Sequence, residues 1–185
     1  MSLTRTEPEG YFTREAYRAW CEVQPRGRFE RVEGRIVAIA PERRAHMRVK
    51  VAVFKALERA IDVAGVKCEV LPDGATVEAG ENDYEPDATV NCGEPMKDDD
   101  IAAPNPVIVV EVLSPGTRSV DTGGKLVGYF MVPSIAHYLI VDPMRPIVIH
   151  HRRDGDRIGT SILSSGPIAM DPPGITVTVE EFYDN

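Results

Sequence analysis

The chain has 185 residues and a formal net charge of −8. This length suits one domain spanning residues 1–185, in which we expect residues 1–12 to be a flexible segment. There is no apolar run of membrane-spanning length and no secretory signal in the first ten residues, so we predict a cytoplasmic protein with no membrane partner. The acidic charge argues against a broad polyanion-binding surface, because nucleic-acid affinity rests largely on Lys and Arg.

The three cysteines predict neither a disulfide framework nor a zinc site. Cys21, Cys68 and Cys92 are odd in number and far apart, and no C-x-x-C pair is present. We therefore expect reduced thiols, mostly packed in the interior.

The first third of the chain predicts a helix, a hairpin and a second helix. Thr13 suits the N-cap of a short helix that runs through Cys21. Residues 29–32 and 35–39 read as two strands that meet at Glu33-Gly34. The region 45–64 has an amphipathic helical pattern with Gly65 as its stop. Its apolar positions are Met47, Val51, Phe54, Leu57 and Ile61.

The remainder predicts an α/β fold. We expect strands at 66–71, 84–91 and 106–113, a helix at 121–131, a strand at 135–141, a hairpin of 147–152 with 157–163, and a last strand at 175–179. The strand, helix and strand between residues 107 and 141 imply a right-handed parallel crossover. The expected architecture is a mixed β-sheet flanked by helices, with additional β-hairpins.

Two carboxylates interrupt apolar strand patterns. Asp87 lies in the segment 85–90 and Glu111 in the segment 107–113. An ionised carboxylate buried in a strand is costly unless it is paired, hydrogen-bonded or bound to a cation, so a shared metal ion explains both. Hard cations prefer oxygen ligands, and the strand-end carbonyl of Val112 could complete the set. The alternative for Asp87 is an ordinary turn aspartate.

The chain then resembles a known family over about residues 13–179. The order of elements resembles that of the Uma-two putative restriction endonucleases, which belong to the PD-(D/E)XK superfamily. The matching residues are Pro86-Asp87, Glu111-Val112-Leu113-Ser114-Pro115-Gly116-Thr117, Asp121, Lys125, Tyr129 and Tyr138-Leu139-Ile140-Val141-Asp142-Pro143. The resemblance implies a restriction-endonuclease-like fold in which Asp87 and Glu111 bind Mg²⁺ or Mn²⁺. Such an ion could polarise a phosphate oxygen and activate a water for in-line attack.

The resemblance also assigns a lysine. The superfamily's usual lysine lies two residues after the second acid, where this chain has Leu113. In the Uma-two pattern the lysine lies on the following helix, and Lys125 has the matching position. It could orient water or stabilise charge on the pentavalent phosphorus. The alternative is a solvated lysine paired with Asp121. Tyr129, one turn later, could hydrogen-bond the lysine or a phosphate, or could simply pack in the core.

Two upstream residues match the family pattern. Glu30 could bind the metal through water or hold Lys125, or it could be a salt-bridged surface glutamate. His46 could contact a phosphate or a metal-bound water, or it could cap or pack the long helix. His150 and His151 should point to opposite faces of their strand, so they do not easily share one ion. We expect His137 to pack.

The sequence therefore favours a metal-dependent endonuclease that hydrolyses DNA phosphodiester bonds, acting as a homodimer so that two sites address two strands. The alternative is a nuclease-fold binding or regulatory module with weak catalysis. An ion between the carboxylates favours the enzyme, and a dry salt bridge there favours the module. We also expect Asp87 and Glu111 to approach each other, Lys125 to point toward them, and crowding to raise the pKa of at least one acid.

Overall fold

The computed structural model describes residues 8–114 and 122–183, and of Thr122 only the backbone. Its helices are α1 (Arg14–Glu22), α2 (Arg44–Ala64), α3 (Thr122–Met131) and the 3-10 helix η1 (Glu180–Phe182). Its strands are β1 (Phe29–Val32), β2 (Arg35–Ala38), β3 (Cys68–Pro72), β4 (Val77–Ala79), β5 (Asn82–Tyr84), β6 (Ala88–Cys92), β7 (Pro106–Val112), β8 (His137–Val141), β9 (Val148–Asp154), β10 (Arg157–Leu163), β11 (Pro167–Met170) and β12 (Ile175–Thr178).

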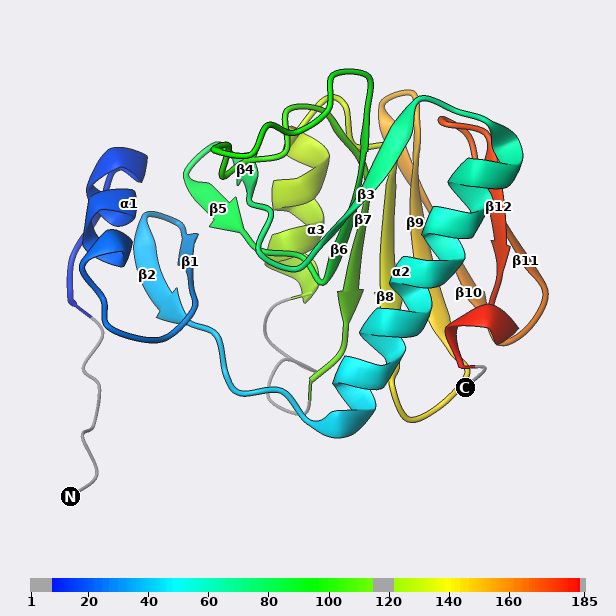
Figure 1. The fold of residues 1–185 in the computed structure, drawn as a ribbon, viewed down its shortest axis with the longest axis horizontal. Coiled ribbons are helices and arrows are strands. Elements are labelled where there is room, and N and C mark those ends of the chain that lie inside the picture. The colour runs from blue at the N-terminus through cyan, green and yellow to red at the C-terminus, as the bar shows by residue number, and fades with distance from the viewer. Residues whose placement is uncertain (1–7, 115–121, 184–185) are drawn as a thin grey trace.

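The centre of the molecule is a six-stranded sheet in the order β10-β9-β8-β7-β6-β3. Strands β7 and β8 are parallel and the other neighbours are antiparallel. The predicted parallel crossover through α3 is therefore confirmed. Helix α2 lies on one face of this sheet, together with the β11-β12 ribbon, and α3 lies on the other face (Figure 1).

Strand β7 supplies alternate side chains to these two faces. Ile108, Val110 and Val112 belong to the core under α2, whereas Val109 belongs to the core under α3. This alternation follows from the pleat of a strand. It also turns the one acidic residue of β7, Glu111, toward the α3 face.

Helix α2 matches the predicted span, but only part of the predicted apolar stripe faces the core. Met47 is 48% exposed and Val51 is 54% exposed. Leu57 and Ile61 are buried as predicted, and the rest of the buried stripe consists mainly of the smaller residues Val49, Val53, Ala56 and Ala60. Small side chains let the helix pack close to the sheet, so they take the inner face.

The predicted hairpin of β1 and β2 is present, and Glu33 and Gly34 both have positive φ, as a tight two-residue turn requires. The sequence did not reveal β4 and β5, which extend this hairpin into a second sheet in the order β2-β1-β5-β4. It also did not reveal β11. The predicted strand 84–91 is in fact divided, because β5 ends at Tyr84 and β6 begins at Ala88. Asp87 thus lies where the chain passes from one sheet to the other.

The prediction of reduced thiols is wrong for two cysteines. Cys68 on β3 and Cys92 on β6 are directly opposite each other and form a disulfide, with a Cα–Cα distance of 4.0 Å. Their separation of 24 residues carries no motif, so only strand pairing reveals the bond. Cys21 is a free, partly buried thiol.

Glycines weaken α3 as an isolated helix, yet one of them has a packing role. A Cβ on Gly128 would lie 2.5 Å from the Tyr84 hydroxyl oxygen. Glycine is therefore needed for the close approach of α3 to β5. Within the described ranges, no helix has both the length and the apolarity needed to cross a membrane.

Candidate active site

A cleft of ≈ 420 Å³ lies where β6 begins, β7 ends and α2 and α3 both start. Five of the six predicted catalytic residues line it, and so does Val112. These residues are Glu30, His46, Asp87, Glu111 and Lys125. Tyr129 is fully buried and contacts Glu111 from behind. Residues separated by as many as 95 positions in the sequence are thus brought together.

Asp87 forms hydrogen bonds with the backbone at the end of strand β7. Its N–H donates to the carbonyl of Val110 at 3.0 Å, and its Oδ2 accepts a hydrogen bond of 2.6 Å from the N–H of Val112. Lys50 Nζ lies 3.1 Å from Oδ1, and His46 Nε2 lies 3.4 Å from Oδ2. Burial by itself raises the pKa of Asp87, but His46, Lys50 and the Val112 N–H outweigh it and lower the pKa below its usual value.

Glu111 is held from the opposite side of the sheet. Its Oε1 accepts a hydrogen bond of 3.0 Å from Lys125 Nζ and one of 2.6 Å from the Tyr129 hydroxyl. Burial raises the pKa of Glu111 to about 7, and the charges of Asp87 and Glu30 act in the same direction while Lys125 opposes them. A raised pKa for one of the two acids agrees with the expectation from sequence, although burial rather than crowding is the main cause.

Lys125 points toward the acids, as predicted. Its Nζ donates to Glu30 Oε1 at 2.9 Å as well as to Glu111, and the whole residue is only 8% exposed. A solvated lysine is therefore excluded, whereas the proposed partner Asp121 lies outside the described residues. Glu30 is buried too and also accepts from the N–H of Glu85 at 2.8 Å. It is thus not a surface glutamate, and it holds Lys125.

Tyr129 both packs in the core and donates a hydrogen bond, which are the two roles that the sequence left open. The acceptor, however, differs from the one predicted. Its ring packs 5.0 Å from the rings of Tyr84 and of Tyr138. Its hydroxyl bonds Glu111 rather than the predicted lysine or a phosphate. Burial raises the pKa of Tyr129 well above its usual value, so the hydroxyl is a proton donor at neutral pH.

His46 contacts the strand end rather than open solvent. Its Nε2 lies 2.7 Å from the Val112 carbonyl oxygen, which can only accept, so Nε2 carries a proton. The carbonyl that we expected to bind a metal ion therefore already accepts one hydrogen bond, and its second lone pair remains as a possible ligand. Burial lowers the pKa of His46, but Asp87, Val112 and Glu42 raise it overall.

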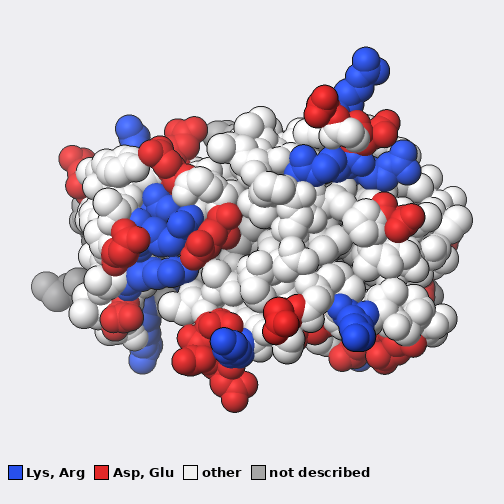
Figure 2. All heavy atoms as spheres, turned by 90° about the horizontal axis from the view of Figure 1, so that it is seen from above, with Lys and Arg blue, Asp and Glu red and all other residues white. Residues whose placement is uncertain are grey.

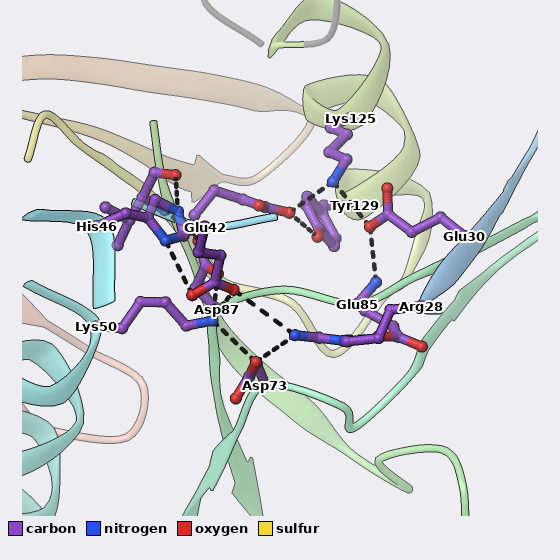
Figure 3. Close-up of polar contacts among 12 residues, drawn as sticks. Arg28, Glu30, Glu42, His46, Lys50, Asp73, Glu85, Asp87, Lys125 and Tyr129 are labelled. Atoms are coloured by element: carbon purple, nitrogen blue, oxygen red, sulfur yellow. Dashed lines mark hydrogen bonds and ion pairs between the residues drawn. The ribbon is translucent and has the colours of Figure 1, made fainter. Parts of the chain in front are cut away.

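Sequence reasoning missed an ionic network beside these residues (Figure 3). Lys50 Nζ contacts Glu42 Oε1 at 2.6 Å and Asp73 Oδ2 at 2.9 Å in addition to Asp87. Arg28 pairs with Asp73 and with Glu85. A signal for Lys50 was present, because it follows His46 by four residues and so lies on the same face of the helix. Its carboxylate partners come from distant segments that carry no motif.

The donor atoms fit a hard divalent ion. Asp87 and Glu111 supply carboxylate oxygens to one cleft. A second set overlaps the first, since one potential ligand atom each from Glu42, His46 and Asp87 lie within 4.8 Å of one another. Asp87 is common to both sets. The oxygen donors suit Mg²⁺ or Mn²⁺, whereas an imidazole ligand is more typical of transition metals such as Zn²⁺.

Charges on the surface are mixed rather than separated. In the view of Figure 2, basic and acidic side chains lie next to one another near the two ends, and the middle of this face has few charges. No continuous basic surface is seen there, which agrees with the net charge of −8.

Comparison with known proteins gives a consistent assignment. The model of the Uma2 family, described as "Putative restriction endonuclease", matches residues 14–180. Two uncharacterized Synechocystis proteins are similar in sequence. One, slr1290, is 28% identical over 173 residues, which cover 91% of this chain and 90% of the relative. The other, sll1609, is 28% identical over 138 residues, which cover 74% of this chain and 78% of the relative.

A solved structure shows the same fold. The crystal structure of a putative nuclease belonging to DUF820 from Anabaena variabilis superposes with a TM-score of 0.67, covering 89% of this chain and 94% of the other. The sequences are 12% identical, so this likeness concerns the fold alone. The predicted restriction-endonuclease-like architecture is therefore confirmed.

Proposed function

Because the chain belongs to the Uma2 family of restriction-endonuclease-like proteins, we propose that it is a divalent-metal-dependent endonuclease that hydrolyses phosphodiester bonds of DNA. The observation that carries this proposal is the cleft in which Asp87, immediately before β6, and Glu111, on the neighbouring strand β7, come together and Lys125 bonds the second acid. Family membership and fold support a nuclease in general. The metal, the substrate and the residue roles are our proposal.

Asp87 and Glu111 would hold Mg²⁺ or Mn²⁺, with the Val112 carbonyl as a further ligand. A bound divalent ion supplies Lewis-acid polarisation of the phosphate and makes water a better nucleophile at neutral pH. Lys125 would orient the attacking water or stabilise charge on the phosphorus, since its ammonium is fixed by Glu30 and Glu111. Tyr129 would keep the Glu111 carboxylate in place, and His46 would keep the Val112 carbonyl and Asp87 aligned.

Two further proposals concern the setting. A homodimer would let two clefts address the two strands of a duplex, and light scattering in solution tests this. A cytoplasmic location would give access to DNA. The disulfide Cys68–Cys92 is unusual for that compartment, so the redox state of these cysteines in cells is worth measuring by thiol labelling.

One observation favours the alternative of a binding module with weak catalysis. Each of the two acids already has cationic partners within the chain, namely Lys50 and His46 for Asp87 and Lys125 for Glu111. A module would bind DNA without cutting it, whether or not a divalent ion is added.

The test is cleavage of supercoiled plasmid and of single-stranded DNA with Mg²⁺ or Mn²⁺. We expect cleavage by the wild type, none with chelator, and none by Asp87→Ala. Asp98→Ala is the matched control, because Asp98 is an exposed acid outside the cleft. DNA binding without metal-dependent cleavage would establish the alternative.

A further inference from the structure

We propose that the ammonium group of Lys50 is a built-in cation that fills a second divalent-ion site next to the metal site of the proposed nuclease, so that the protein uses one metal ion rather than two. This inference rests on the proposed function for its role in catalysis. It concerns a positioning residue that touches Asp87 and Glu42 but not the reacting atoms.

The geometry around Lys50 resembles the coordination of an ion. Three carboxylate oxygens converge on Nζ, and they come from three separate segments. The N–O distances are 2.6 Å to Glu42 Oε1, 2.9 Å to Asp73 Oδ2 and 3.1 Å to Asp87 Oδ1. Mg²⁺ binds oxygens at about 2.0–2.1 Å, so the same three oxygens would need to close by about 0.5 to 1 Å.

The other donors of such a site are also present. The second oxygens of Glu42 and Asp87 lie near His46, at 3.4 Å from Nδ1 and from Nε2 respectively. His46 Nδ1 is buried and has no hydrogen-bond partner. This imidazole nitrogen is a further possible metal ligand, and it lies next to the carboxylates that Lys50 neutralises.

The position relative to Asp87 explains why a cation is needed there. In two-metal phosphodiesterases a carboxylate is shared by two ions about 3.5–4 Å apart. Here one oxygen of Asp87 faces Lys50, while the residue as a whole lines the same cleft as Glu111. A compact ammonium with three donors can satisfy three carboxylates at once. Lys50 is well placed for this because its side chain is only 9% exposed.

A purely structural salt bridge would have the same geometry, so the test must count bound ions. We would measure Mn²⁺ bound per chain at neutral pH from the electron paramagnetic resonance signal of free Mn²⁺. For the wild type we expect one ion, and for Lys50→Ala we expect two. Lys50→Arg restores a cation and should return the count to one.

The matched control is Lys55→Ala, which removes an exposed lysine from the next turn of the same helix. It should leave the count at one. If Lys50→Ala does not fold in metal-free buffer, as judged by circular dichroism, the double variant Lys50→Ala/Asp73→Asn relieves part of the repulsion. It still has Glu42, His46 and Asp87 as ligands, and the same gain of one ion is expected.

The two proposals fail in different ways. The difference between variant and wild type tests the role of Lys50, and no gain of an ion would overturn it. The count for the wild type tests the nuclease proposal, and zero ions there would contradict metal dependence. A gain from zero to one would thus support the inference on Lys50 while rejecting the metal centre beside it.

Discussion

The central sheet has a buried polar cluster toward each end, and the two clusters handle charge in opposite ways. At the end where β7 stops, Asp87 and Glu111 are surrounded by cationic groups. Toward the other end, His137 at the start of β8 lies beside Ile108, four residues before Val112 in the parallel register. Its Nδ1 lies 2.9 Å from His150 Nε2.

The difference lies in the partners rather than in the depth of burial. Burial lowers the pKa of His137, and it lowers that of His150 to about 4 with help from the nearby His137, Arg152 and His151. These imidazoles are therefore neutral at pH 7, and one proton lies between the two facing nitrogens. At the acidic end the chain keeps ions inside by pairing them. Buried ionised groups are thus found at the cleft of the proposed nuclease, where they have a chemical role, and neutral groups are found at the other end of the sheet.

The largest expected effect is at the acidic end. Asp87→Asn preserves shape but removes the charge that faces Lys50 and His46. Loss of groups that merely support metal ligands costs about 10–100-fold, so replacing a ligand should lower cleavage by more than about 100-fold. Rates of plasmid cleavage at saturating Mn²⁺ would show this. Asp98→Asn should cleave as the wild type does, and an active Asp87→Asn would remove Asp87 from the metal site.

The second effect concerns stabilisation by metal. A ligand that binds only the native state adds about 2.7 kcal/mol to the free energy of unfolding at a hundredfold excess over its dissociation constant. Glu111→Gln should lose this gain. Its amide oxygen can still accept from Lys125 and Tyr129, so metal-free stability should change little. Urea unfolding with and without Mn²⁺ measures both quantities, and an undiminished gain in the variant would show that Glu111 is not a ligand.

The third effect is the protonation of His150, which would place a charge at the end of the sheet that is otherwise neutral. The folded-state pKa of His150 is about 4, below the ordinary value of 6.5, so between these values the unfolded state binds more protons. Stability from this group is therefore full above pH 6.5 and falls on acidification, by about 2 kcal/mol at pH 5. His150→Leu should lose less stability than the wild type between pH 7 and pH 5 in urea titrations. Equal losses would mean that the pair does not control acid sensitivity.

The smallest expected effect concerns the hydrogen bond that Tyr129 donates to the Glu111 carboxylate. Tyr129→Phe removes the hydroxyl that bonds this carboxylate while keeping the packed ring. A hydrogen bond to a charged group contributes about 1.5–3 kcal/mol, and we expect the lower part of that range because Lys125 remains. Tyr11→Phe is the control, since its hydroxyl bonds Glu81 at the surface. Equal melting temperatures for the two variants would argue against a positioning role for Tyr129.

The sequence by itself predicted most of the elements, although not β4, β5 or β11, and it pointed to Asp87 and Glu111 as candidate site residues. The helical period of residues 44–64, the Gly65 stop and the apolar run of β7 are local patterns, and local sterics decide them. The same runs made Asp87 and Glu111 conspicuous, because a carboxylate in an apolar strand needs a partner. The resemblance to a family supplied Lys125, although the ordinary lysine position holds Leu113.

Only the tertiary structure decided the partners. The pairing of Cys68 with Cys92, the inner stripe of α2 and the contact of Tyr129 with Glu111 depend on strand register and helix rotation. Lys50 carried one local signal, its spacing of four residues from His46, but its partners carried none, because it meets Glu42, Asp73 and Asp87 only after α2 has packed onto the sheet. Contacts between residues far apart in the chain are set by packing of whole elements, and no local pattern encodes them.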